Sequence, residues 1–227
     1  MATQKDIAIK QILTDFEAFS NLTLQQLDLL EKHINSDETE ISENQLKKFK
    51  KNEKLFDQFE VNISERIINS IVLYNPMASD IRILMACYRM SLNMERIGDL
   101  IMNIVQFISK IKDPEIYKKS IDLIDKMLAI SRKMVTRALV SFINKDTTLA
   151  IWTIKNDEVV DEYHHKLLKK SIMGSDVSKE VRNLLLSYMD LKSIISNIER
   201  IADHATNIAE ASIYAHEGTD IRHKGSL

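Results

Sequence analysis

The chain contains few of the residues that make tight turns, with four glycines and two prolines among 227 residues. Sheet folds joined by short hairpins depend on those residues, so their scarcity favours long helices with short connections. Cys87 is the only cysteine, which excludes an internal disulfide and a cysteine-based zinc site. No segment approaches the roughly 18 apolar residues of a membrane span, and the N-terminus lacks a signal-peptide pattern. We therefore expect no membrane insertion and a cytoplasmic location.

An excess of charge of one sign is also missing. Charged residues make up 28% of the chain, but the net charge is only −2. This balance gives no basic footprint, so we expect no nucleic-acid partner. The sequence has no glycine-rich phosphate loop and no Ser-His-Asp or Cys-His arrangement, so we expect no enzymatic activity.

Apolar residues recur at helical spacing along most of the chain and predict six long helices. The expected helices cover residues 4–34, 39–74, 76–110, 114–143, about 147–173 and about 176–218. Asn75 is expected to cap the third helix, with Pro76 at its first position, and Asp113-Pro114 gives the same start signal for the fourth. Gly174-Ser175 is expected to separate the last two helices. Short connections make neighbouring helices antiparallel, so the predicted fold class is all-α, built from helical bundles.

The two halves of the chain repeat each other at an offset of 104 residues. NMERIGDLIMNI (93–104) and NIERIADHATNI (197–208) match at Asn, Glu, Arg, Ile, Asp, Asn and Ile. The same offset pairs NEKLFD (52–57) with NDEVVD (156–161). The sequence therefore predicts two tandem homologous three-helix bundles, residues 1–112 and 113–218, followed by a polar tail at 219–227.

The repeated segments carry acidic pairs four residues apart, on one helical face. Each bundle would contribute one pair from its second helix and one from its third. These candidate metal ligands are Glu53, Asp57, Glu95, Asp99, Asp157, Asp161, Glu199 and Asp203. Four carboxylates on facing helices repel one another unless a proton, an arginine or a metal compensates. Their oxygens suit hard or borderline cations such as iron, zinc, manganese or magnesium, with Asn103 and Asn207 as further oxygen donors.

Alternatives to a metal site stay open at this point. Acidic pairs at this spacing are common on solvated helices, and duplicated packing positions could explain the repeat in a purely structural scaffold. We expect Arg96 and Arg200 to pair with neighbouring helices, and His204 to have a surface or inter-helix role. Glu162 and His165 form one E-x-x-H motif, but a di-iron carboxylate centre requires two.

Three segments closely resemble the PhoU family of bacterial and archaeal regulators of phosphate uptake. They are the paired E-R-I-x-D-x-x-x-N-I motifs, N-P-M-A-S-D-I-R (75–82) and NIAEASIYAHEGTDIRH (207–223). The resemblance implies two similar three-helix bundles, with multinuclear iron or zinc clusters at the E/D-x-x-x-D motifs of some members.

The same resemblance implies a function. The expected function is that of a non-enzymatic negative regulator of phosphate-starvation signalling. The protein would act as an adaptor between the ATP-binding subunit of a phosphate ABC transporter and a sensor histidine kinase. A homodimer is expected. One alternative is a PhoU-like regulator of another ion transporter, and a less favoured one is a di-iron metalloprotein.

Overall fold

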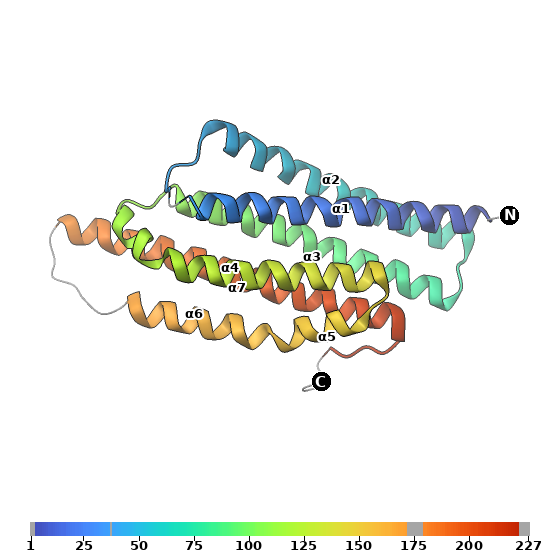
Figure 1. Ribbon diagram of the computed structural model, residues 1–227. Helices are drawn as coiled ribbons and strands as arrows, with labels where there is room; N and C mark the ends of the chain where they lie inside the picture. Colours follow the sequence, from blue (N-terminus) through green and yellow to red (C-terminus); the bar gives the residue numbers. More distant parts are fainter. Residues whose placement is uncertain (1–2, 37, 172–178, 223–227) are drawn as a thin grey trace.

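The computed structural model describes residues 3–36, 38–171 and 179–222, with side chains outside 165–182. All regular structure in these residues is helical, which confirms the all-α prediction. The helices are α1 (Gln4–Ile34), α2 (Glu43–Tyr74), α3 (Ala78–Ile108), α4 (Pro114–Asn144), α5 (Thr147–Lys155), α6 (Asp157–Ser171) and α7 (Lys179–Glu217). In Figure 1, α1–α3 lie together on one side and α4–α7 on the other, with the long axes roughly aligned. The two tandem bundles predicted from the repeat are therefore present.

The helix starts follow local capping chemistry. The Thr3 side chain accepts from the backbone N–H of Asp6, and Asp6 accepts from the backbone N–H of Thr3, which forms a capping box for α1. Ser42 and Gln45 form the same box for α2, so this helix begins at Glu43, four residues after the predicted start. Asp113 caps α4 and Pro114 occupies its first turn, as the sequence predicted.

The predicted role of Asn75 and Pro76 was wrong. Asn75 ends α2 in the left-handed conformation (φ 42°), which Asn tolerates better than most residues, and Pro76 lies in the link. Met77 is extended at the N-cap of α3, and Pro76 is not a helical residue. An Asn-Pro pair between two helical patterns can end one helix or begin the next, and the sequence does not distinguish the two.

The predicted fifth helix is divided at Asn156 into α5 and α6. The backbone N–H of Asn156 bonds to the Thr153 carbonyl (3.1 Å), a 3₁₀ bond, while the Asn156 side chain donates to the Trp152 carbonyl (2.8 Å), which an α-helical N–H would have used. Its repeat counterpart, Asn52, stays inside α2 and donates to Gln26 Oε1 (2.7 Å). The Gly174-Ser175 break and residues 223–227 of the predicted tail lie outside the described residues.

One hydrophobic core runs through both bundles, centred on the packing of α3 against α7. Phe16 of α1 and Phe142 of α4 meet edge to face, with ring centroids 5.0 Å apart. Cys87 is fully buried, as its flanking residues predicted. The bundles therefore pack as one body, and no described helix is long and apolar enough to cross a membrane.

The third helix of each repeat unit has a small residue at the equivalent position, Gly98 in the first half and Ala202 in the second. In the first half, Gly98 lies against Phe56, and a Cβ added at Gly98 would come within 2.6 Å of the Phe56 ring. At the offset of 104 residues the second half has Val160 in place of Phe56 and Ala202 in place of Gly98, and both are buried. The contact of Gly98 with Phe56 brings α2 close to α3, the two helices that carry the acidic pairs of the first half.

Candidate functional site

The four candidate ligands of the first half, Glu53, Asp57, Glu95 and Asp99, form what we call the first acidic row. It lies where α2 packs against α3. Glu95 of α3 keeps 22% of its side-chain surface exposed. Burial raises its pKa, and the neighbouring carboxylates of Asp99, Asp57 and Glu60 raise it further, while Arg96 opposes them. Glu53 lies half-buried one turn before Asp57 on α2. The charges of Asp99 and Asp57 therefore act on Glu95, and so does the charge of Glu60, which the sequence analysis did not name.

Arg96 does not follow the prediction that it pairs with a neighbouring helix. Its guanidinium lies 3.5 Å from Glu95 Oε2 and 3.2 Å from Asp99 Oδ2, both on α3 itself. A long arginine side chain can bend back over its own helix to a residue three positions later. Arg96 thus offsets part of the negative charge of the first row, on the α3 side.

The second acidic row consists of Asp157, Asp161, Glu199 and Asp203, and it lies between α6 and α7. Burial raises the pKa of Asp157 to about 6, and the charges of Asp203, Asp161 and Glu158 add to this rise. The pKa of Asp203 is also raised, by burial and then by Glu199 and Asp161. The hydroxyl of Thr206 on α7 acts on the Asp157 carboxylate in the opposite direction and lowers its pKa, and Asp157 Oδ1 is closed off from solvent. All four predicted residues of the second half therefore share one electrostatic environment.

His164 and Glu60 are functional candidates that the sequence reasoning missed. His164 Nδ1 lies 2.9 Å from Glu199 Oε1 and connects α6 to α7 across the second row. Subtracting the repeat offset of 104 from 164 gives position 60, and the charge of Glu60 contributes to the raised pKa of Glu95 in the first row. Extending the aligned motif by three residues would have revealed both. The first row is thus all oxygen, whereas the second includes an imidazole.

His204 joins the two halves of the molecule. Its Nδ1 lies 2.8 Å from Asn93 Oδ1 on α3, which confirms an inter-helix role rather than membership of the acidic row. Burial lowers the pKa of His204 to about 4, and the positive charges of Arg200 and Arg96 lower it further. A neutral imidazole therefore lies at the α3–α7 seam.

The two acidic rows contain oxygen donors that suit a metal ion, but these donors do not converge on one point. Carboxylate oxygens, with the imidazole of His164 in the second row, suit hard or borderline cations. Within the described part of the chain, however, no three His, Cys, Asp or Glu side chains stand close enough together to hold an ion. Binding a cation would require these side chains to turn toward one another. Asn103 is half-buried and Asn207 is exposed on the same two helices.

Comparisons with known proteins agree with the repeat and the fold. The family model described as "PhoU domain" matches the chain twice, at residues 17–108 and 124–212. A protein of Aquifex aeolicus named "Phosphate-specific transport system accessory protein PhoU homolog" is 34% identical over 90% of this chain and 89% of its own. A Burkholderia sp. protein of the same name is 32% identical over 76% of this chain and 73% of its own. The crystal structure of PhoU from Pseudomonas aeruginosa superposes with a TM-score of 0.81 at 22% identity, covering 95% of this chain and all of that one.

Proposed function

The chain belongs to the PhoU family, and from this premise we propose that it is a non-enzymatic negative regulator of phosphate uptake and phosphate-starvation signalling. The observation that carries the proposal is the double match of the family model, one copy in each bundle. The names of the Aquifex and Burkholderia relatives associate those proteins with phosphate-specific transport. We expect regulation to proceed by binding. A protein that binds one conformational state of its partner more tightly than another shifts the partner toward that state.

The proposed partners are the ATP-binding subunit of a phosphate ABC transporter and a sensor histidine kinase, both reached from the cytoplasm. When phosphate is plentiful, the adaptor would favour the inhibited state of the kinase and restrain uptake. A homodimer is part of this proposal. A regulator of another ion transporter is the second candidate, because rows of carboxylates favour cations and do not by themselves indicate phosphate as the transported ion.

Each acidic row is proposed to hold one or more cations. In the first half the ligands would be Glu53, Asp57, Glu95 and Asp99, and in the second half Asp157, Asp161, Glu199 and Asp203. Iron or zinc, or else manganese or magnesium, would suit these donors. The raised pKa values of Glu95, Asp157 and Asp203 support the proposal. Burial first, and then neighbouring carboxylates, make the ionised form of these groups unfavourable, and a bound cation would offset both effects. A cation shared by both helices would fix their relative position and the surface offered to a partner.

The regulatory role is tested by deleting the gene and following a phosphate-starvation reporter in phosphate-rich medium. We expect the deletion to switch the reporter on and the wild-type gene to switch it off again. A reporter for starvation of another transported ion, measured in the same cells, separates the two candidate functions. If the phosphate reporter stays silent while the other responds, the proposed phosphate role is wrong.

A further inference from the structure

One side of α2 is exposed along the length of the helix. Among the described residues α2 contacts only α1 and α3, and it forms an outer edge of the molecule in Figure 1. Its outermost positions recur in steps of three and four residues, which places them on one stripe. The members of this stripe, all exposed, are Lys47, Lys51, Lys54, Gln58, Val61, Glu65, Ile68 and Val72. We call the stripe the outer face of α2. It is about 40 Å long, at 1.5 Å per residue, and changes from basic to apolar along the helix.

The basic half of the outer face lies in a cluster of lysines. The segment KKFKKNEK (47–54) carries five lysines, all exposed, and one acid, Glu53, which belongs to the first acidic row. Lys47 pairs with Glu43 (2.7 Å), and the other four lysines form no ion pair in the described part of the chain. An exposed pair within one helix contributes little. The exposed acids of α2 are fewer and are spread along the helix: Glu43, Asp57 and Glu65. The cluster therefore keeps a concentrated positive charge.

The apolar half of the outer face exposes large side chains. Ile68 is 58% exposed and Val72 is 75% exposed. Leu73, at the end of α2, and Met77, in the link to α3, are 70% and 71% exposed, and Val61 is half exposed. Single exposed apolar residues are ordinary, but a group of them on one face marks an interaction site.

The repeat shows that packing of the helices does not require this face. At the offset of 104 residues, the counterpart of 47–54 is IWTIKNDE (151–158), which has one lysine. The acidic pairs occur in both halves, whereas the lysine cluster occurs only in the first. We therefore look for the role of the cluster outside the helical bundles.

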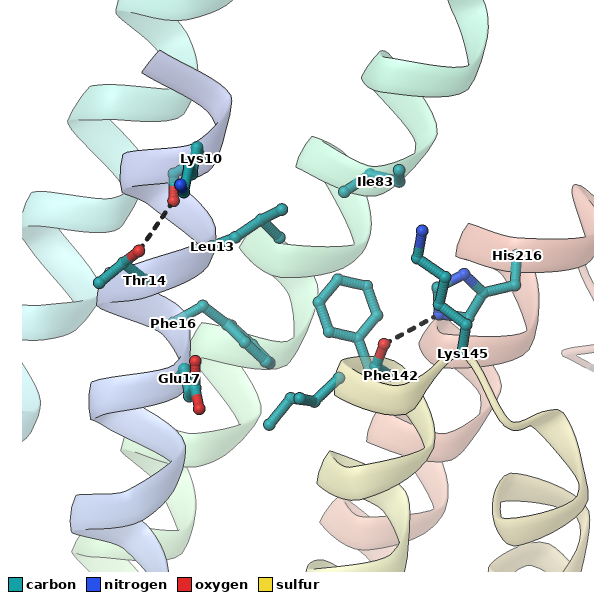
Figure 2. Close-up of a pocket in the computed structure, with 10 residues that line it drawn as sticks. Lys10, Leu13, Thr14, Phe16, Glu17, Ile83, Phe142, Lys145 and His216 are labelled. Atoms are coloured by element: carbon teal, nitrogen blue, oxygen red, sulfur yellow. Dashed lines mark hydrogen bonds between the residues drawn. The ribbon is translucent and has the colours of Figure 1, made fainter. Parts of the chain in front are cut away.

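A cavity of about 230 Å³ between the two halves is a contrasting apolar feature. Figure 2 shows Phe16 and Phe142 in its wall, and both side chains are buried in an edge-to-face contact. Lys10 and Lys145 also line it, but so does Glu17, so it has no uniform charge. Because the rings are recessed, a broad flat partner can contact the outer face of α2 but not the wall of this cavity.

We propose that the outer face of α2 lies on an anionic lipid surface. The lysines would contact the phosphate headgroups, and the exposed side chains of Ile68, Val72 and Leu73 would enter the boundary between headgroups and acyl chains. Clusters of four to eight basic residues on an amphipathic helix are typical of binding to anionic lipids. Apolar side chains on the same face add to that binding. A second copy of the chain fits less well, because its matching face carries the same positive charge.

This contact is with the membrane surface and requires no helix that spans the bilayer. It goes beyond the regulatory function and does not depend on it, since lipid binding can be measured on the purified chain. A protein held at the surface would encounter membrane-bound partners more often than one free in solution.

The test is co-flotation of the full-length protein with vesicles of phosphatidylglycerol and phosphatidylcholine in equal parts, compared with vesicles of phosphatidylcholine alone. EDTA is present so that divalent cations cannot bridge the acidic rows to the lipid. We expect binding to the mixed vesicles and much weaker binding to the neutral ones. Binding should weaken as salt rises from about 0.1 M to about 0.5 M, because salt screens the attraction between lysines and headgroups.

A triple variant tests the role of the lysines. It combines Lys50→Gln, Lys51→Gln and Lys54→Gln, all at exposed positions. Binding to the mixed vesicles should weaken on the order of 100-fold, because each lysine near an anionic surface contributes about fivefold. The matched control removes the same charge from exposed positions of α4, with Lys118→Gln, Lys119→Gln and Lys126→Gln. This control should bind like the wild type.

A single variant tests the role of the apolar half. Leu73→Ser should weaken vesicle binding about tenfold, because a leucine side chain is no longer withdrawn from water. Met189→Ser, which replaces a residue of α7 that is 65% exposed, is its control and should leave binding unchanged.

Four outcomes would overturn the proposal. Three of them are no binding of the wild type to the mixed vesicles, equal binding to both kinds of vesicle, and an equal loss of binding in the α4 control. The fourth comes from analytical ultracentrifugation. A wild-type dimer that Leu73→Ser dissociates would show that a second copy, and not lipid, covers the outer face of α2.

Discussion

Replacing Asp157 by Asn should stabilise the metal-free protein at neutral pH. Raising the pKa of Asp157 from 3.8 to about 6 corresponds to about 3 kcal/mol of unfavourable free energy in the ionised native state. The carboxylate is only partly withdrawn from water, so screening reduces this figure to about 1.5 kcal/mol. Because asparagine carries no charge, the variant should unfold with a free energy larger by about that amount.

The pH dependence of the stability difference between Asp157→Asn and the wild type is a sharper test than the size of that difference at one pH. A native pKa above the unfolded value means that the native state binds the extra proton, so the stabilisation from protonation is complete below about 3.8 and is lost as pH rises through about 6. The advantage of Asp157→Asn should therefore be full at pH 7–8 and should vanish near pH 4. His204 titrates over the same range, so the comparison must be between variant and wild type at each pH.

Urea denaturation in EDTA at pH values from 8 to 4.5 would measure this difference. Asp122→Asn, which removes an exposed carboxylate from α4, is the matched control and should change little. With excess zinc or manganese the order should reverse, because the wild type gains a ligand that the variant lacks. If Asp157→Asn is less stable than the wild type in EDTA at pH 8, the electrostatic account of the second row is wrong.

Three further predictions concern packing, titration and backbone conformation. Gly98→Ala should lower the free energy of unfolding by about 1–3 kcal/mol because its new Cβ would overlap the Phe56 ring. An unchanged free energy of unfolding in Gly98→Ala, measured by urea denaturation, would contradict the tight contact between Gly98 and Phe56. His204→Gln should flatten the loss of stability as pH falls below 6.5, because a histidine whose native pKa is lowered to about 4 favours unfolding on acidification. Lys145→Gly should raise the free energy of unfolding by about 1 kcal/mol by relieving the left-handed strain, measured by urea denaturation.

Much of the fold could be predicted because its signals are local. The capping residues Thr3, Asp113 and Gly218 lie next to the helix ends that they define, and the apolar spacing between them is regular. The repeat supplied the division into two bundles. The failures at Pro76 and Asn156 have different causes. An Asn-Pro pair can end one helix or begin the next, and the local sequence does not distinguish the two. The side-chain bond that Asn156 makes four residues back also occurs at Asn93 and Asn197 inside unbroken helices, so it does not predict a break.

The acidic pairs within each helix could be predicted from the sequence, because residues four apart on one helix share a face however the helices pack. The pairing of His164 with Glu199 joins two helices, and the bend of Arg96 back onto α3 depends on which side of the helix is left open. Spacing along one helix cannot determine either arrangement. The contact of His204 with Asn93 depends in turn on how one bundle lies against the other.

The claim that connects this fold to its function is that each half holds its second and third helices together through a cation. Elemental analysis of protein purified without chelator or affinity-tag metal tests it most directly, alongside the Glu95→Gln, Glu199→Gln double variant. The account predicts stoichiometric iron, zinc or manganese in the wild type and its loss from the double variant. Equal metal content in the two proteins, or none in the wild type, would contradict it, and the acidic rows would then be surfaces for packing and docking alone.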